Sequence, residues 1–311
     1  MPDNKHSARA RFDKLRSTLR LPVVVAPMFL VSGPDIVIAA ARARVIGSFP
    51  APNARSIDVF AEWVEQISAA TETWAQNLIV HSTYERLDAE LEILRQYKPP
   101  VVITALGNPA RVIDAVHEWG GRVIADVNSV DLARKAAAAG ADGLALVAAG
   151  AGGHTGQMAG FAFVPAVREF FDGILILAGA IGDGRAVRAA EVLGADLCYM
   201  GTRFIASEES IAFETYKQMI VDSDFSDLIL SSSFTGAEAY YLRQSIIAAG
   251  LDPDALVSKG KMDLSGSESR VKAWKDIWSA GQGIGTVHAV QPVADIIEQL
   301  DAEYVAARDL P

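Results

Sequence analysis

The stretch GILILAGAIGDGRAVRAAEVLGADLCYMGTRF, residues 173–204, decides the fold. It opens with an apolar run at 173–182, continues with a segment of helical periodicity at 183–193, and returns to an apolar run at 195–204. Asp183 stands where a helix N-cap is favoured, and the helical segment ends on a glycine, a residue favoured at helix C-termini. Strand, capped helix and strand in this order are typical of a parallel βα unit.

The same alternation runs through the first two thirds of the 311 residues. Eight apolar runs, each long enough for a strand, lie at 21–28, 43–50, 74–81, 99–107, 121–128, 141–150, 173–182 and 195–204. Helix candidates fill the intervals, at 35–43, 56–71, 82–97, 108–119, 129–139, 163–171 and 183–193. Strands that are apolar along their whole length are buried on both faces, so eight of them favour a closed (β/α)8 TIM barrel. An open doubly wound sheet is the alternative that the pattern leaves open.

The alternation of strand and helix candidates ends after the eighth apolar run. Residues 205–285 predict a mostly helical C-terminal excursion over the barrel mouth, and residues 292–307 predict a terminal helix. We therefore expect a cofactor-binding barrel formed by 1–204 and 286–311, with 205–285 as a segment that covers the substrate.

Composition narrows the class of partner and the compartment. The chain has 28 basic and 38 acidic residues, a net charge of −10, which makes nucleic acid an unfavourable partner. It has no apolar stretch long enough to span a membrane, and its polar start lacks the apolar core of a signal peptide. The single cysteine, Cys198, has no partner for an internal disulfide. We expect a cytoplasmic protein, without a metal site, that forms a homo-oligomer at most.

Chemistry in such barrels lies where the strands end at their carboxyl termini. The loop AAGAGGHTGQ (148–157) follows the sixth run and places His154 among glycines, which let backbone and a flat ligand approach closely. The loop is not a dinucleotide fingerprint, because Thr155 stands where the third glycine is required. A tight turn with a satisfied histidine remains the plainer interpretation.

Two further loops predict a phosphate site. Gly179 and Ala180 end the seventh run and Gly201 and Thr202 end the eighth, each before a helix candidate. Small residues and helix N-termini after these two strands commonly bind phosphate in TIM barrels. The alternative is that tight packing alone requires these glycines. Cys198 lies inside the eighth run and is interpreted as a core residue.

The order and spacing of five motifs identify a family resemblance over residues 20–305. They are APM (26–28), NL (77–78), GAGGHTG (150–156), LAGAIGDGRAV with LGADLCYMGTRF (177–204), and WSAGQGIG (278–285). Together they resemble the flavin-dependent nitronate monooxygenases, formerly called 2-nitropropane dioxygenases. The resemblance implies FMN at the barrel mouth, with His154 as the catalytic residue. The cofactor contacts it implies are Ala26, Pro27, Met28, Asn77, Gly153, Gly179, Ala180, Gly201, Thr202, Gln282 and Gly283.

The family's chemistry supplies a role for each part. A neutral imidazole at His154 would take the acidic α-proton of a nitroalkane, and the imidazolium would balance the resulting nitronate. Redox chemistry with O2 would belong to the FMN and yield a carbonyl compound and nitrite. Phe234, Tyr240, Tyr241 and Trp278 would roof the pocket, or serve as core packing.

One residue departs from the family pattern. Asp126, near the end of the fifth run, stands where some relatives have Lys or Gln. A carboxylate beside the flavin would disfavour an anionic reduced ring, so Asp126 either points away or tunes the flavin differently. Two other functions stay open: an FMN-dependent enoyl-thioester reductase using NAD(P)H, and a non-catalytic barrel that binds a phosphorylated ligand.

Overall fold

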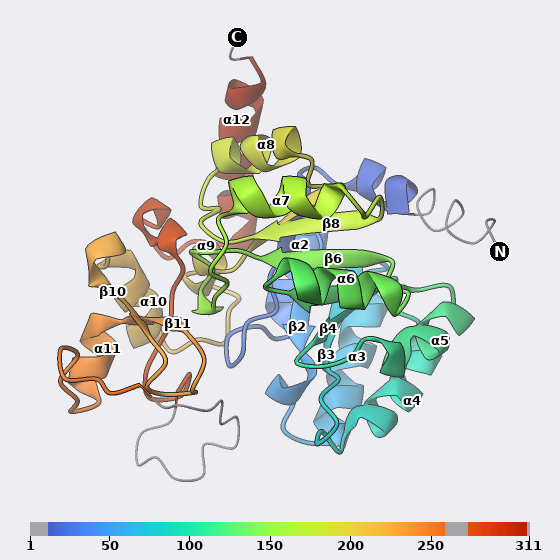
Figure 1. Cartoon of the computed structure of the whole chain (residues 1–311), viewed down its shortest axis with the longest axis horizontal. Helices are drawn as coiled ribbons and strands as arrows, with labels where there is room; N and C mark the ends of the chain where they lie inside the picture. Colours follow the sequence, from blue (N-terminus) through green and yellow to red (C-terminus); the bar gives the residue numbers. More distant parts are fainter. Residues whose placement is uncertain (1–11, 259–272, 310–311) are drawn as a thin grey trace.

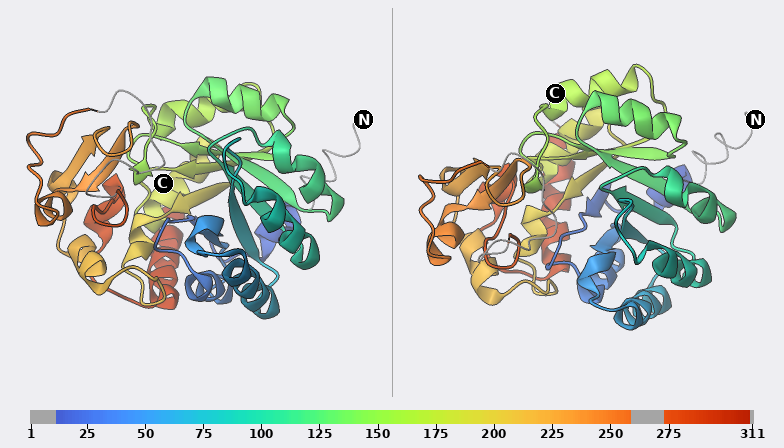
Figure 2. Two further views of the ribbon diagram at one scale, coloured as in Figure 1. Left: turned by 90° about the horizontal axis from the view of Figure 1, so that it is seen from below. Right: turned by 60° about the horizontal axis from the view of Figure 1, so that its bottom comes forward.

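The computed structural model describes residues 12–258 and 273–309. Its main sheet contains eight parallel strands in the order β1-β9-β8-β6-β5-β4-β3-β2. Their bounds are β1 (Val23–Val25), β2 (Gly47–Pro50), β3 (Trp74–Ile79), β4 (Val101–Ala105), β5 (Arg122–Val127), β6 (Gly143–Val147), β8 (Ile174–Ala178) and β9 (Leu197–Met200). A parallel bridge between Val24 and Ile46 brings β1 to β2 and nearly closes the barrel. The predicted TIM barrel is confirmed, and the open sheet is excluded (Figures 1 and 2).

Helices surround this sheet (Figure 2). They are α2 (Pro34–Arg42), α3 (Ile57–Ala70), α4 (Leu87–Tyr97), α5 (Ala110–Glu118), α6 (Val130–Ala138), α7 (Gly160–Arg168), α8 (Gly184–Leu193) and α12 (Val293–Arg308). Three of them begin with a side-chain cap, in which Ser56, Ser129 or Asp183 accepts a backbone N–H of the first turn. Only the four-residue α9 (Thr202–Ile205) directly follows β9, and α12 packs against α8 and α2 in its place.

Strand residues alternate between two cores. On β5, Ile124 belongs to a cluster inside the barrel, whereas Val123 and Ala125 belong to the larger cluster between strands and helices. On β9, Leu197 and Tyr199 belong to the inner cluster. Phe12, from a helical segment at residues 12–18, is 3% exposed and joins the inner cluster, which fills the barrel axis with apolar side chains.

The excursion, yellow through orange to red-orange in Figure 1, lies on one side of the barrel. It holds α10 (Glu214–Val221), η2 (Phe225–Asp227), β10 (Leu228–Ser231), β11 (Ala239–Leu242), α11 (Arg243–Ala248) and η3 (Gln282–Thr286). The antiparallel hairpin of β10 and β11 was not predicted, and β11 also pairs with β7 (Gly153–His154). The expectation of a mostly helical segment missed this sheet, because each strand has at most four residues and too little periodicity to detect. Residues 259–272 of the expected excursion lie outside the described residues.

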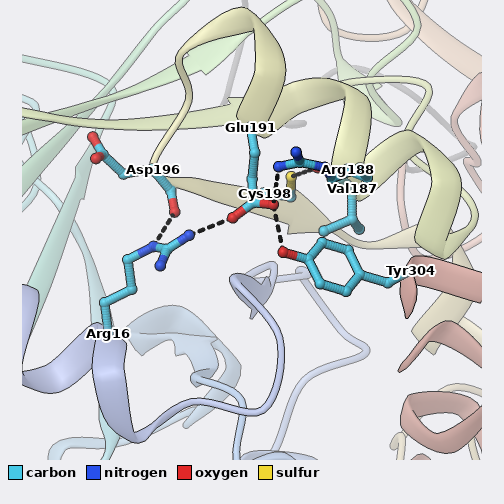
Figure 3. Close-up of polar contacts among 7 residues, drawn as sticks. All are labelled: Arg16, Val187, Arg188, Glu191, Asp196, Cys198 and Tyr304. Carbon is cyan, nitrogen blue, oxygen red and sulfur yellow. Dashed lines mark hydrogen bonds and ion pairs between the residues drawn. The ribbon is translucent and has the colours of Figure 1, made fainter. Parts of the chain in front are cut away.

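A polar cluster joins the two ends of the chain on the outside of the barrel (Figure 3). Glu191 of α8 pairs with Arg16 and accepts a hydrogen bond of 2.5 Å from the Tyr304 hydroxyl of α12. Cys198 lies beside this cluster and is 1% exposed, and burial raises the pKa of its thiol. A protonated, buried thiol fits the predicted core role. In the described part of the chain, no helix is long and apolar enough to cross a bilayer.

Candidate active site

His154 lies in β7, just beyond the carboxyl end of β6. Its pairing with Ala239 of β11 fixes the backbone, and Trp274 packs against the imidazole edge-on with a ring separation of 5.5 Å. Burial lowers the pKa of His154, so the neutral imidazole is favoured near pH 7. An uncharged histidine at the barrel mouth is the protonation state that a general base requires.

Thr235 holds the imidazole from the excursion. Its hydroxyl Oγ1 lies 2.8 Å from His154 Nε2 and also donates to the carbonyl of Ala237 at 3.3 Å. Nε2 acts as the donor when the hydroxyl proton points to Ala237, and as the acceptor when that proton points to the ring. Nδ1 of His154 makes no hydrogen bond to any described residue. Thr235 therefore orients the ring through one nitrogen and leaves the other without a partner among the described residues.

The glycines around His154 serve the protein more than a ligand. A Cβ on Gly150 would lie 2.8 Å from Gln282 Oε1, and one on Gly152 would lie 2.8 Å from the backbone nitrogen of Gly281. A Cβ on Gly156 would overlap the carbonyl of Val147. At these three glycines the close approach is made by the protein's own atoms. An added Cβ on Gly153, whose φ is +71°, would meet only Trp274, at 3.7 Å, which is an ordinary contact.

The C-terminal segment packs over this loop through Gln282 and Gly283. The backbone N–H of Gln282 donates to the Gly150 carbonyl at 2.9 Å, and its Nε2 donates to the Tyr240 hydroxyl at 2.7 Å. Gly283 packs on Gly182, 3.2 Å from an added Cβ to the Gly182 Cα. Ser279 adds a further tie, accepting the Gly153 N–H at 2.7 Å.

The end of β9 provides unpaired donors. Among the described residues, the backbone N–H groups of Gly201 and Thr202 donate no hydrogen bond. The Thr202 hydroxyl accepts the Gly281 N–H at 2.7 Å and keeps its own proton to donate. An added Cβ on Gly201 would meet only Met28 at 3.5 Å and Ala26 at 3.7 Å, ordinary contacts. Protein packing does not require glycine here, and the two N–H groups are free to bind a ligand.

The end of β8 differs from the prediction in detail. The Ala180 N–H donates to the Gly150 carbonyl at 3.3 Å, and Gly179 packs against the backbone of the loop after β6. At the start of α8, the Asp183 side chain accepts the Ala186 N–H and Glu303 accepts the Gly184 N–H. Carboxylates therefore occupy a helix end that was expected to bind phosphate. An anion here would depend on the loop donors after β9.

The loop after β1 is rigidly held. Asn53, 5% exposed, donates to the carbonyls of Met28 and Ser32, and its Oδ1 accepts the Leu30 N–H. Ala26 is tied to β9 through its N–H to the Met200 carbonyl at 3.0 Å. Ala26 and Met28 thus lie next to Gly201, at 3.7 and 3.5 Å from an added Cβ.

Three polar side chains come from the mouth ends of the strands. Asn77 is 5% exposed, and its amide donates to the Ile103 carbonyl at 3.4 Å without joining the other predicted residues. Asp126 shares the inward side of β5 with Ile124, and burial raises its pKa to about 7, with the nearby Tyr199 hydroxyl opposing part of the rise. Neither Asp126 Oδ1 nor the Tyr199 hydroxyl reaches a hydrogen-bond partner of standard geometry among the described residues.

The aromatic residues expected as a roof divide into two groups. Tyr241 is fully buried and stacks on Trp274, with Phe234 packed edge-on against it. Trp278 stacks on Tyr216 at 4.9 Å. These contacts are core packing of the excursion, whereas the Tyr240 hydroxyl bonds to Gln282 in the segment over the mouth.

Fold and site together define a TIM-barrel enzyme with a neutral histidine at its mouth. The chain matches the family model described as nitronate monooxygenase over residues 45–303 and belongs to that family. The nitronate monooxygenase of Paraburkholderia phytofirmans is 25% identical over 91% of this chain and 92% of its own length. Family relatives of this kind are flavoprotein oxidoreductases, and this chain is an oxidoreductase of the same family.

Other similarities extend the comparison. The (3aS,4S,5R,7aS)-5-hydroxy-7a-methyl-1-oxo-octahydro-1H-indene-4-carboxyl-CoA dehydrogenase of Mycobacterium tuberculosis is 28% identical over 73% of this chain, which spans 64% of that relative. FabK from Thermotoga maritima superposes with a TM-score of 0.79 and 26% identity, over 96% of this chain and 97% of its own. The nitroalkane oxidase from Streptomyces ansochromogenes, with a TM-score of 0.77 and 23% identity over 94% and 98%, shares the fold.

Four residues of the site were not predicted. Thr235, Trp274 and Ser279 contact His154 or its neighbour Gly153 from positions at least 80 residues away along the chain. Tyr199 is the partner of Asp126. The strand alternation of β9 would have placed Tyr199 inside the barrel, but no local pattern marks the other three.

Proposed function

We propose that this protein is an FMN-dependent nitronate monooxygenase that converts alkyl nitronates or nitroalkanes, with O2, to a carbonyl compound and nitrite. The observation that carries the proposal is the neutral His154 with one nitrogen held by Thr235 and the other free. Family membership over residues 45–303 supports the same chemistry.

The residues present fit FMN. Unpaired N–H groups of Gly201 and Thr202 suit the phosphate, since backbone donors in a loop bind anions well. Ala26 and Met28 lie next to Gly201, where they would border a flat ring held beside these donors. When bound, the flavin supplies the electron transfer to O2.

The protein's own residues supply the proton step. His154 accepts the α-proton of a neutral nitroalkane at its free nitrogen, and the electron pair of that C–H bond passes to the nitro group. The imidazolium that forms lies beside the nitronate anion, so charge separation is small. Thr235 keeps the ring oriented through this change, and Trp274 shields it from water.

The test compares two substrates in one variant. His154→Asn keeps the size of the side chain and the glycine loop, so FMN content should remain. Activity on neutral nitroalkane should fall by roughly 10²–10⁴-fold, the usual cost of losing a general base. Oxidation of a preformed nitronate, which has no proton to lose, should fall much less. Equal losses on both substrates would refute the base role of His154.

A second candidate function is the FMN-dependent reduction of enoyl thioesters with NAD(P)H. It is supported by the similarity to the carboxyl-CoA dehydrogenase of Mycobacterium tuberculosis. Anaerobic addition of NADH and of a nitronate to separate samples distinguishes the two. Rapid bleaching of the flavin by NADH alone would favour the reductase, and bleaching by the nitronate alone would favour the monooxygenase.

A further inference from the structure

A carboxyl and a hydroxyl group lie close together inside the barrel mouth. Asp126 Oδ1 and the Tyr199 hydroxyl are both buried, and neither has a hydrogen bond of standard geometry among the described residues. The Tyr199 hydroxyl is nevertheless close enough to Asp126 to lower the pKa of its carboxyl by hydrogen bonding. Buried polar atoms of this kind usually meet a ligand or water. Both residues face the barrel interior, one from β5 and one from β9.

The strands between them explain how they approach each other. In the register of the sheet, Asp126 lies beside Ala145 of β6, and Tyr199 lies beside Ala178 of β8. Both alanines belong to the inner cluster and are almost fully buried. Only small side chains therefore lie beside the carboxyl and the hydroxyl on these strands, and the two groups shift each other's pKa.

Among the residues that the structure describes, no charged side chain contributes to the pKa shift of Asp126. The flanking strand β4 has Thr104 and Ala105 at this height, and β6 has Ala145 and Val147, none of which is charged. Arg122 is on the same side of β5 but four residues away, about 13 Å along the strand. The Tyr199 hydroxyl is therefore the group that faces the carboxyl.

We propose that Tyr199 and Asp126 act as a positioning pair in which Asp126 stays a neutral acid and donates a hydrogen bond to the flavin, making reduction of the cofactor depend on the protonation of Asp126. This inference depends on the flavin site of the proposed function. It answers the conflict raised by the sequence, because a neutral acid does not repel an anionic reduced ring. Loss of the proton at higher pH introduces that repulsion, so the bound flavin becomes harder to reduce.

The experiment measures the midpoint potential of the flavin in the purified holoenzyme from pH 5.5 to 8.5, against reference dyes. Between the pKa of Asp126 in the oxidised enzyme and its higher pKa in the reduced enzyme, the wild-type potential should fall more steeply with pH, by up to about 30 mV per pH unit for one extra proton taken up with two electrons. Asp126→Asn, which has a permanent neutral donor, should lose this additional slope. Tyr199→Phe should move the steeper region to higher pH, because the Tyr199 hydroxyl lowers the pKa of Asp126.

A matched control lies next to Tyr199 on the same strand. Cys198 belongs to the outer cluster, so Cys198→Ala should keep the wild-type pH profile. If Asp126→Asn shifts the potential equally at every pH, or if Tyr199→Phe leaves the steep region in place, the proposal is overturned. No substrate is used, so a protein inactive on nitronates would refute the proposed reaction and leave this result interpretable.

Discussion

Removal of the Asp126 charge should stabilise the flavin-free protein at high pH. The folded-state pKa of about 7 lies above the ordinary value of 3.8 because burial disfavours the carboxylate. Between these values the folded protein holds a proton that the unfolded chain has lost, so stability falls as the pH rises through this window. Each tenfold change in proton affinity is worth 1.36 kcal/mol, which sets an upper limit of about 4 kcal/mol.

Asp126→Asn should therefore unfold like the wild type near pH 4 and become more stable than it by about 1–4 kcal/mol at pH 8. Urea unfolding of the flavin-free proteins at intervals between these values measures the difference. Asp172, an exposed acid, provides the matched control Asp172→Asn, which should show no such trend. A difference between Asp126→Asn and wild type that is constant across the pH range would refute the reasoning, since it would report packing and not titration.

Three more substitutions test the packing around the site. Gly201→Val should fold, because packing does not require glycine there, but it should lose most of its FMN because the larger side chain would crowd the free N–H groups. Absorbance after gel filtration measures the FMN content, and full occupancy would contradict the site. Gly152→Ala should cost about 1–3 kcal/mol and weaken FMN binding, since its Cβ would press on the Gly281 backbone, whereas Gly285→Ala, with nothing within 4 Å, should do neither. Glu191→Gln should lower the unfolding free energy by about 1–3 kcal/mol without loss of FMN, and unchanged stability would show that the cluster in Figure 3 does not clamp the termini.

The barrel could be predicted because its signals are local. Each strand is a short apolar run and each helix follows it with a cap such as Ser56 or Asp183, so the information lies within about 30 residues. The sheet of β7, β10 and β11 could not be predicted in this way. Its register joins His154 to Ala239, and two-residue and four-residue strands have no measurable period.

The sequence drew attention to the glycines around His154, but it did not show why glycine is required at each position. Gly150, Gly152 and Gly156 were noticed because they surround His154, but their packing partners are Gln282, Gly281 and the Val147 carbonyl. A glycine that admits a ligand and a glycine that admits backbone look identical in a sequence. The difference lies in which atoms an added Cβ would touch.

Burial is the largest cause of the pKa shift at both titratable groups of the mouth, His154 and Asp126. Because neither shift is caused mainly by a fixed countercharge, a ligand that displaces water should enlarge both shifts. The pKa of His154 would fall further, and the pKa of Asp126 would rise further. His154 would become more firmly neutral, and Asp126 more firmly protonated. A neutral nitroalkane would then enter an uncharged site, and proton transfer would produce an imidazolium and a nitronate, whose charges cancel. On the proposed function, the site has no net charge before the proton moves, and afterwards the imidazolium and the nitronate cancel. His154 can therefore act as a buried base without a permanent counterion.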